Sequence, residues 1–151
     1  DPYNPKLLWE HTYNDTTAPG CSGTDRNCNM GNTKGVAIGR VQVGTDIHTY
    51  VFVASSWHDK QTVTDSGGNP VDVYGLNITA LEFETGDVVW HTALPYTPGG
   101  SNSAQEGNDT PAIPALMDLD NNFTSDVVLV GDMQGRLWGL WTHNGESLQT
   151  E

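Results

Sequence analysis

The side chains best suited to chemistry are gathered in the acidic segment 118–126, which has the sequence DLDNNFTSD. Its alternate residues carry side-chain oxygens, and Thr124 can add a backbone carbonyl. Calcium takes about six to eight oxygen ligands, and alternate residues of a tight loop can point inward around such an ion. Carboxylates this close repel one another when no cation lies between them. The segment therefore predicts a calcium site with the ligands Asp118, Asp120, Asn122, Thr124 and Asp126.

The predicted calcium loop differs from an EF-hand in two respects. Leu129 occupies its twelfth position, where an EF-hand has a bidentate Glu, and the flanking residues have the pattern of strands. Phe123 occupies the sixth position, where Gly normally makes the sharp turn, so we expect Asn121 or Asn122 to adopt the unusual backbone dihedral. The alternative is a surface turn rich in Asp and Asn that binds no metal.

Glycosylation is a competing interpretation of the same segment. Asn122-Phe123-Thr124 is an Asn-x-Thr sequon, and further sequons begin at Asn14, Asn77 and Asn108. A glycan on Asn122 and a metal ion bound to its side chain exclude each other, so the two interpretations of this residue are alternatives.

Candidate catalytic residues are few. Ser55, Ser56, His58 and Asp59 lie together, but no strand, elbow and helix pattern surrounds them. The other histidines show no paired ligand spacing, and most of the tryptophans have the apolar neighbours that are typical of core residues. We therefore expect a protein that is not an enzyme.

The chain has two cysteines, Cys21 and Cys28, in a polar segment. A disulfide between them would close a small loop, contribute about 2.5 kcal/mol and imply an oxidising compartment. The spacing Cys-x6-Cys matches neither a zinc knuckle nor a c-type haem site. A disulfide is therefore the favoured interpretation, and two free thiols are the alternative.

The charge of the chain excludes several classes of partner. Six Lys and Arg residues stand against 19 Asp and Glu residues, which gives a formal charge of -13. A net field of this sign repels nucleic acid and anionic membranes and attracts cations. The sequence has no run of 18 apolar residues and begins at Asp1 without a signal-peptide pattern, so we expect no membrane span and a mature or excised fragment.

Composition and periodicity favour an all-β fold. Gly (17) and Pro (8) are frequent, and apolar residues alternate with polar ones in short stretches separated by turn residues. Hairpins are predicted over residues 36–54 and 73–90, and further strands near 114–117, 126–131 and 136–141. Long loops are predicted over residues 14–33, 56–71 and 94–110.

An internal repeat refines this fold class. Residues 80–90 and 139–149 are two versions of one phrase, a strand, a turn ending in Gly and a second strand, 59 residues apart. Such a repeat is typical of a β-propeller, whose antiparallel blades take about 40 residues each. We therefore expect residues 1–151 to form a single propeller-like fragment of two to three blades, which is part of a larger protein or closes against other chains.

Several phrases, in this order, resemble a known family. They are residues 7–10, 31–33, 38–41, 50–53 and 80–90, followed by the more specific residues 110–112, 118–120, 126–132 and 135–138. The last group is similar to a calcium loop followed by a GDxxGxLW strand. The phrases together resemble the C-terminal propeller of the PilY-type proteins, which function in the tip and biogenesis of type IV pili.

The resemblance implies a function and a location. Asp118, Asp120, Asn122, Thr124 and Asp126 match that family's calcium loop position by position. The implied role is pilus assembly, surface attachment or control of retraction by calcium. The implied partners are other pilus or filament subunits or the remainder of the propeller, at the cell surface or outside the cell.

The phrase of residues 80–90 also resembles the PQQ-like repeat of quinoprotein propellers. In that group a Trp at the end of the phrase docks one blade on the next, which assigns blade docking to Trp90, Gly86 and Ala80. A quinoprotein-like dehydrogenase fragment is therefore one alternative function. A scaffold propeller without metal is the other.

Overall fold

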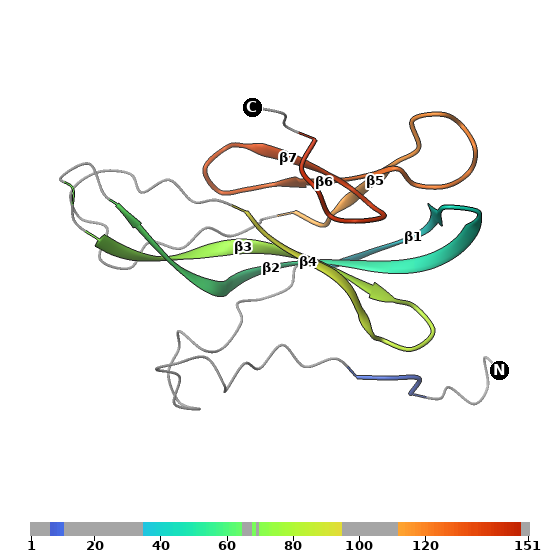
Figure 1. Cartoon of the computed structure of the whole chain (residues 1–151), viewed down its shortest axis with the longest axis horizontal. Helices are drawn as coiled ribbons and strands as arrows, with labels where there is room; N and C mark the ends of the chain where they lie inside the picture. The colour runs from blue at the N-terminus through green and yellow to red at the C-terminus, as the bar shows by residue number, and fades with distance from the viewer. Residues whose placement is uncertain (1–6, 11–34, 65–67, 69, 95–111, 149–151) are drawn as a thin grey trace.

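The structure, a computed structural model, describes residues 7–10, 35–64, 68, 70–94 and 112–148. These residues form antiparallel strands without any helix, as the composition predicts. Accordingly, the described part of the chain contains no helix that is long and apolar enough to cross a membrane. A four-stranded sheet and a three-stranded sheet lie one above the other (Figure 1).

The first sheet is a meander in the order β1-β2-β3-β4. Its strands are β1 (Val36–Val43), β2 (Asp46–Thr64), β3 (Pro70–Glu82) and β4 (Val88–Leu94). Gly44 has a φ of 63° in the tight turn between β1 and β2, a conformation that glycine adopts at little cost. The two predicted hairpins are thereby confirmed as neighbours in one sheet.

The predicted loop 56–71 is wrong. Most of these residues belong to β2 and β3, which pair from Lys60↔Tyr74 to Thr64↔Pro70 after a shift of register near Ser56. This part of the hairpin extends beyond the residues that β1 and β4 cover. The segment is mostly polar and has Gly67, Gly68, Asn69 and Pro70 at its centre, a composition that is typical of loops. Residues 14–33 and 95–110 lie outside the described part of the chain.

The second sheet has the order β5-β6-β7. Its strands are β5 (Ala115–Met117), β6 (Val127–Gly131) and β7 (Leu137–Trp141), close to the predicted bounds. After β7 a turn leads to one further bridge, between Leu140 and Ser147. The acidic loop, which we define as residues 118–126, joins β5 to β6.

The main core lies between the two sheets. The first sheet contributes Phe52, Leu76 and Ile78, and the second contributes Val128 and Leu140, all fully buried. Residues that alternate along a strand share a face, so each sheet turns one apolar face toward the other. Removing such side chains from water is the principal source of stability in a fold of this kind.

The first sheet also buries apolar side chains on its opposite face, which we call the outer face. Val51, Val53 and Leu81 form a small cluster there, and Trp9 packs against it. A sheet buried on both faces has strands that are continuously apolar, and residues 50–54 have this character. Residues 76–81 are also buried throughout, although Asn77 and Thr79 are polar. The first sheet is therefore the middle layer, with the second sheet on one side and residues 7–10 on the other (Figure 1).

The repeat seen in the sequence has the same hydrogen bonds in both copies. Glu82 N donates to Asp87 O at 2.8 Å, and Trp141 N donates to Glu146 O at 2.9 Å, 59 residues later. Gly86 and Gly145 occupy equivalent places, with φ values of 76° and 73° that favour glycine. The two turns are therefore structural copies of each other.

Each of these turns receives a tryptophan. Trp90 Nε1 donates to Thr142 O at 2.8 Å, and its ring lies where a Cβ on Gly145 would be. Trp9 Nε1 donates to Phe83 O at 2.7 Å, and its ring covers Gly86 in the same way. The blade-docking residues predicted from the sequence are thus divided between two contacts. Trp90 of β4, with Ala80 as its neighbour on β3, contacts the turn of the second sheet. Gly86 instead contacts the ring of Trp9.

Candidate metal centre

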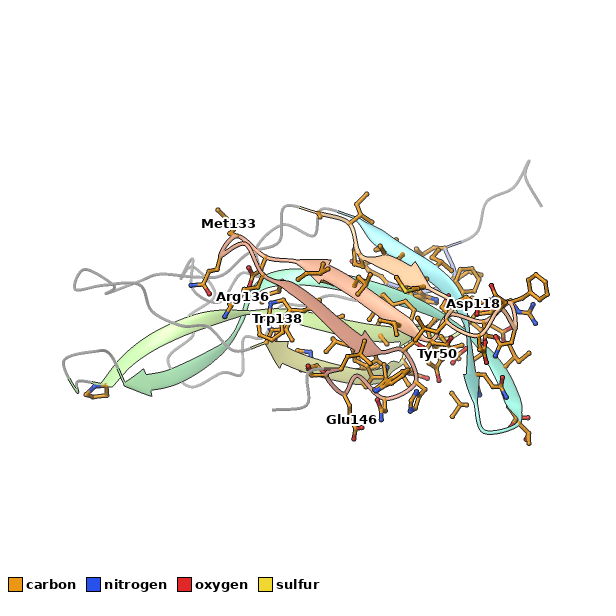
Figure 2. The ribbon with its side chains drawn as sticks, turned by 90° about the horizontal axis from the view of Figure 1, so that it is seen from above. Tyr50, Asp118, Met133, Arg136, Trp138 and Glu146 are labelled. Atoms are coloured by element: carbon orange, nitrogen blue, oxygen red, sulfur yellow. The ribbon has the colours of Figure 1, made fainter. Side chains whose placement is uncertain are left out.

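The acidic loop is fixed to both sheets by backbone hydrogen bonds. Asp126 N donates to Met117 O at 2.9 Å, which closes the loop at its base. Ser125 N donates to the Arg40 carbonyl of β1 at 2.6 Å, and Thr142 N donates to Asp126 O at 2.9 Å. The loop therefore touches the first sheet as well as its own, at the end of the second sheet away from the β6–β7 hairpin that carries Met133 and Arg136 (Figure 2).

Three of the five predicted ligands come together. One carboxylate oxygen from each of Asp118, Asp120 and Asp126 lies within 4.8 Å of the others. Among the described residues no ion pair reaches these carboxylates. The arrangement places several negative charges in a small space, and no cation of the described residues pairs with them. Oxygen donors of this type suit a hard divalent ion.

Backbone N–H groups hold the carboxylates in place. Asp118 accepts from Asn121 N at 2.7 Å and from Phe123 N at 2.9 Å, and Asp126 accepts from Leu119 N at 2.7 Å. Desolvation raises the pKa of Asp118, but the N–H groups of Phe123, Asn121 and Asn122 and a hydrogen bond with Asp120 outweigh it and lower the pKa below its ordinary value. Asp118 is therefore strongly disposed to be ionised.

The backbone turns sharply at two residues of the loop. Asn121 has a φ of 61°, as the sequence suggested for Asn121 or Asn122, and Phe123 itself has a φ of 66°. This left-handed region is disfavoured for residues other than Gly, by about 1–2 kcal/mol, although Asn tolerates it better. The Phe123 side chain is 84 % exposed, so no packing explains the strained backbone. The strain serves instead to point N–H groups at the Asp118 carboxylate.

The remaining two predicted ligands bond to each other. The Asn122 side-chain oxygen accepts from Thr124 N at 2.7 Å and also from the Thr124 hydroxyl. The Asn122 side-chain N–H group donates to Asp120 Oδ2 at 3.1 Å and to Gln42 Oε1 at 3.4 Å. Gln42 lies on β1, 80 residues away in sequence, and nothing in the sequence pattern indicated that it would reach the loop.

The structure describes two of the four sequons and neither cysteine. Asn77 is fully buried on the first sheet, so a glycan at this sequon is incompatible with the fold. Asn122 is exposed, and its side-chain nitrogen bonds to Asp120 and Gln42. Asn14 and Asn108, like Cys21 and Cys28 with their predicted disulfide, lie outside the described residues.

The four polar residues considered for catalysis share one strand. Ser55, Ser56, His58 and Asp59 belong to β2. His48 lies 3.4 Å from Glu82 Oε2, and His91 Nδ1 lies 3.2 Å from Thr79 Oγ1. The three aspartates of the acidic loop are the one cluster of potential metal ligands found among the described residues.

The fold and the site define an all-β protein of two stacked antiparallel sheets, with an acidic loop of the second sheet that contacts the first. Comparison of the chain with protein-family models, with curated proteins and with solved structures gives no match.

Proposed function

We propose that the chain is a non-catalytic, calcium-binding module of an extracellular protein with propeller-like blades. The observation that supports this most directly is the approach of Asp118, Asp120 and Asp126 within 4.8 Å of one another, with no ion pair to relieve their repulsion in the described part of the chain. A divalent cation removes that repulsion and takes carboxylate oxygens as ligands.

Calcium suits the loop better than a softer metal. The donors are carboxylates, and amide, hydroxyl and backbone oxygens lie close by in Asn122 and Thr124. Thiolate and imidazole ligands, which favour zinc or copper, are missing from this cluster. The acidic chain as a whole, at -13, further raises the local concentration of cations.

The proposed role of the ion is to join the two sheets. Ser125 bonds to Arg40 of β1, and the Thr142 hydroxyl donates to Ser125 O at 2.6 Å. An ion that draws the carboxylates together stiffens the loop backbone that makes these two contacts. Because a ligand that binds only the folded state stabilises it, calcium should raise the stability of the whole packed pair of sheets.

The proposal of a propeller in a type IV pilus protein has separate support. It comes from the resemblance of the sequence phrases to PilY-type proteins and from the pair of Trp and Gly contacts that recurs 59 residues apart on the turns. In this proposal the described sheets act as neighbouring blades, and calcium occupancy adjusts their attachment during pilus assembly, adhesion or retraction.

A calcium titration followed by thermal unfolding tests the metal site. At a calcium concentration about 100 times the dissociation constant, the free energy of unfolding should rise by about 2.7 kcal/mol. Asp120→Asn should lose this increase, because it removes one carboxylate of the cluster. Asp46→Asn is the matched control, since Asp46 is exposed in the β1–β2 turn and belongs to no such cluster, and it should respond as the parent chain does. An equal response of all three proteins, or none at all, would rule out this site.

A further inference from the structure

Residues 7–10 have the sequence of a strand but belong to neither of the two sheets that the structure describes. Their Leu-Leu-Trp matches the Val-Val-Trp that begins β4, and Trp9 docks on Gly86 as Trp90 docks on Gly145. Within the described residues, however, no backbone hydrogen bond joins this segment to a strand. Leu7 and Leu8 are 80 % and 70 % exposed, unlike a strand at the end of a packed sheet.

The second sheet, in contrast, has an edge with no complete fourth strand in the described part of the chain. Where the first sheet has β4, the described part of the second sheet has the Leu140↔Ser147 bridge and one hydrogen bond from Leu148 N to Gly139 O at 2.8 Å. In the sequence, Gln149 occupies the position that corresponds to Trp90. As far as residues 112–148 show, the second sheet has no Trp-bearing fourth strand.

These two parts cannot meet within one molecule. Trp9 lies against the outer face of the first sheet, whereas the second sheet packs on the opposite face (Figure 1). The first sheet separates them. The second sheet of a second copy of the chain is free to lie next to residues 7–10.

We propose that residues 7–10 of one molecule form the fourth strand of the second sheet of another copy of this chain. By the register of β3 and β4, Leu7 then lies opposite Leu140, as Val88 lies opposite Leu81, and replaces the pairing of Ser147. Trp9 stays docked on its own Gly86 turn and supplies the tryptophan that Gln149 does not. The new contact reproduces the one already present between the first and second sheets, in which Trp90 extends from β4 to the turn at Gly145.

The faces that this strand exchange brings together are both apolar and partly exposed. On the outer face of the first sheet, Ile38 is 54 % exposed and Val88 is 50 % exposed. On the free face of the second sheet, Leu137 is 63 % exposed, and Leu148 packs over Gly139 beside Leu129. Because different surfaces of the two copies meet, the contact is head-to-tail and leads to a closed ring or a filament rather than a two-fold dimer.

Light scattering on the full chain over a wide range of concentration tests the proposal. The chain should associate into a species of at least two copies, with the same result in calcium and in a chelator, since the contact does not involve the acidic loop. Leu8→Asp should weaken association at least about tenfold, because it places a charge in the new interface. Met133→Asp is the control, because Met133 is 69 % exposed at the tip of the β6–β7 hairpin and outside the interface, and it should associate as the parent chain does (Figure 2).

Two results would overturn the proposal. One is a parent chain that remains monomeric at the highest concentration while circular dichroism reports an intact β fold. The other is equal association of Leu8→Asp and the parent chain. Because Leu8 is exposed in the single molecule, Leu8→Asp should leave the melting temperature of the dilute protein unchanged, so a loss of association is not a loss of folding.

Discussion

The second sheet carries a carboxylate-centred turn at each end, and the two turns compensate negative charge by different means (Figure 2). In the β6–β7 hairpin, the Asp132 side chain is fully buried and lies 2.7 Å from Arg136 Nε and 2.9 Å from Trp138 Nε1. It also accepts from the backbone N–H groups of Gln134 and Arg136. Its charge is therefore matched by a cation of the chain.

The acidic loop holds three carboxylates, and their hydrogen-bond donors are N–H groups of the loop itself. N–H dipoles orient a carboxylate but do not cancel the repulsion among three of them. The chain therefore balances the charge of Asp132 with its own Arg136, whereas the described residues supply no cation to the acidic loop. The calcium ion proposed above would supply that charge. The first turn should therefore be sensitive to mutation, and the second to the metal ion.

Removing the Asp132 carboxylate should have the largest effect. Asp132→Ala leaves the donors of Arg136 and Trp138 without their shared acceptor, and loss of one partner of a buried charged pair costs about 3–5 kcal/mol. We expect about 3 kcal/mol because the Arg136 side chain is partly exposed. Urea unfolding measures the loss, with Asp87→Ala on an exposed turn as the control. Equal stability of the two variants would contradict the assigned role of Asp132.

Relieving the backbone of the acidic loop should stabilise the protein. Phe123→Gly removes a side chain from a residue with positive φ, and the expected gain is about 1 kcal/mol after the greater entropy cost of folding a glycine. Leu119→Gly is the control in the same loop, because Leu119 is exposed and does not have a positive φ. It should leave stability unchanged or lower it. Thermal unfolding in a chelator distinguishes the two, and a loss of stability in Phe123→Gly would argue against strain at this residue.

The acidic loop should also become more stable without metal when one charge is removed. Asp120→Asn keeps an oxygen acceptor for Asn122 N and lowers the repulsion on Asp118 and Asp126. Two unit charges about 4 Å apart in water interact by about 1 kcal/mol. Asp120 faces two such charges, and salt screens both interactions at this exposed loop, so the gain in a chelator should be about 1 kcal/mol. In calcium the order should reverse, with the parent chain more stable. Melting curves in both conditions, repeated in high salt to screen the charges, give the measurement. If Asp120→Asn were the less stable protein in both conditions, repulsion among the carboxylates would not be the force that shapes the loop.

The features that sequence analysis predicted well are the local ones. Strand β1 follows from a near-alternating apolar pattern, and β6 and β7 follow from short apolar runs bounded by turn residues. The repeated turn follows from the spacing of Gly86 and Gly145. The gathering of Asp118, Asp120 and Asp126 needs only that alternate residues of one loop turn inward. Such features depend on a few residues that are close in sequence, so the local amino-acid sequence is enough to predict them.

The features that were missed depend on contacts between distant parts of the chain. Gly86 was grouped with Trp90 because the two are close in sequence, but the ring on Gly86 belongs to Trp9. The extension of β2 and β3 beyond β1 and β4 has a mostly polar sequence with Gly67 to Pro70 at its centre, which is typical of a loop. The contact of Gln42 with Asn122 requires the first sheet to lie beside the second, which no local pattern specifies.

The smallest expected effect is a pH dependence that belongs to Asp118. Its pKa is lowered in the folded protein, so the ionised carboxylate stabilises the fold above the ordinary pKa of 3.8, and this contribution disappears as the pH falls through the lower folded value. Asp118→Asn should therefore show a shallower loss of melting temperature below about pH 4 than the parent chain does. The Asp132 carboxylate is the comparison within the same protein, because it keeps its bond with Arg136 in both the parent chain and Asp118→Asn. Parallel melting curves of the two proteins across this range would mean that the N–H groups of Asn121 and Phe123 do not hold the charge of Asp118.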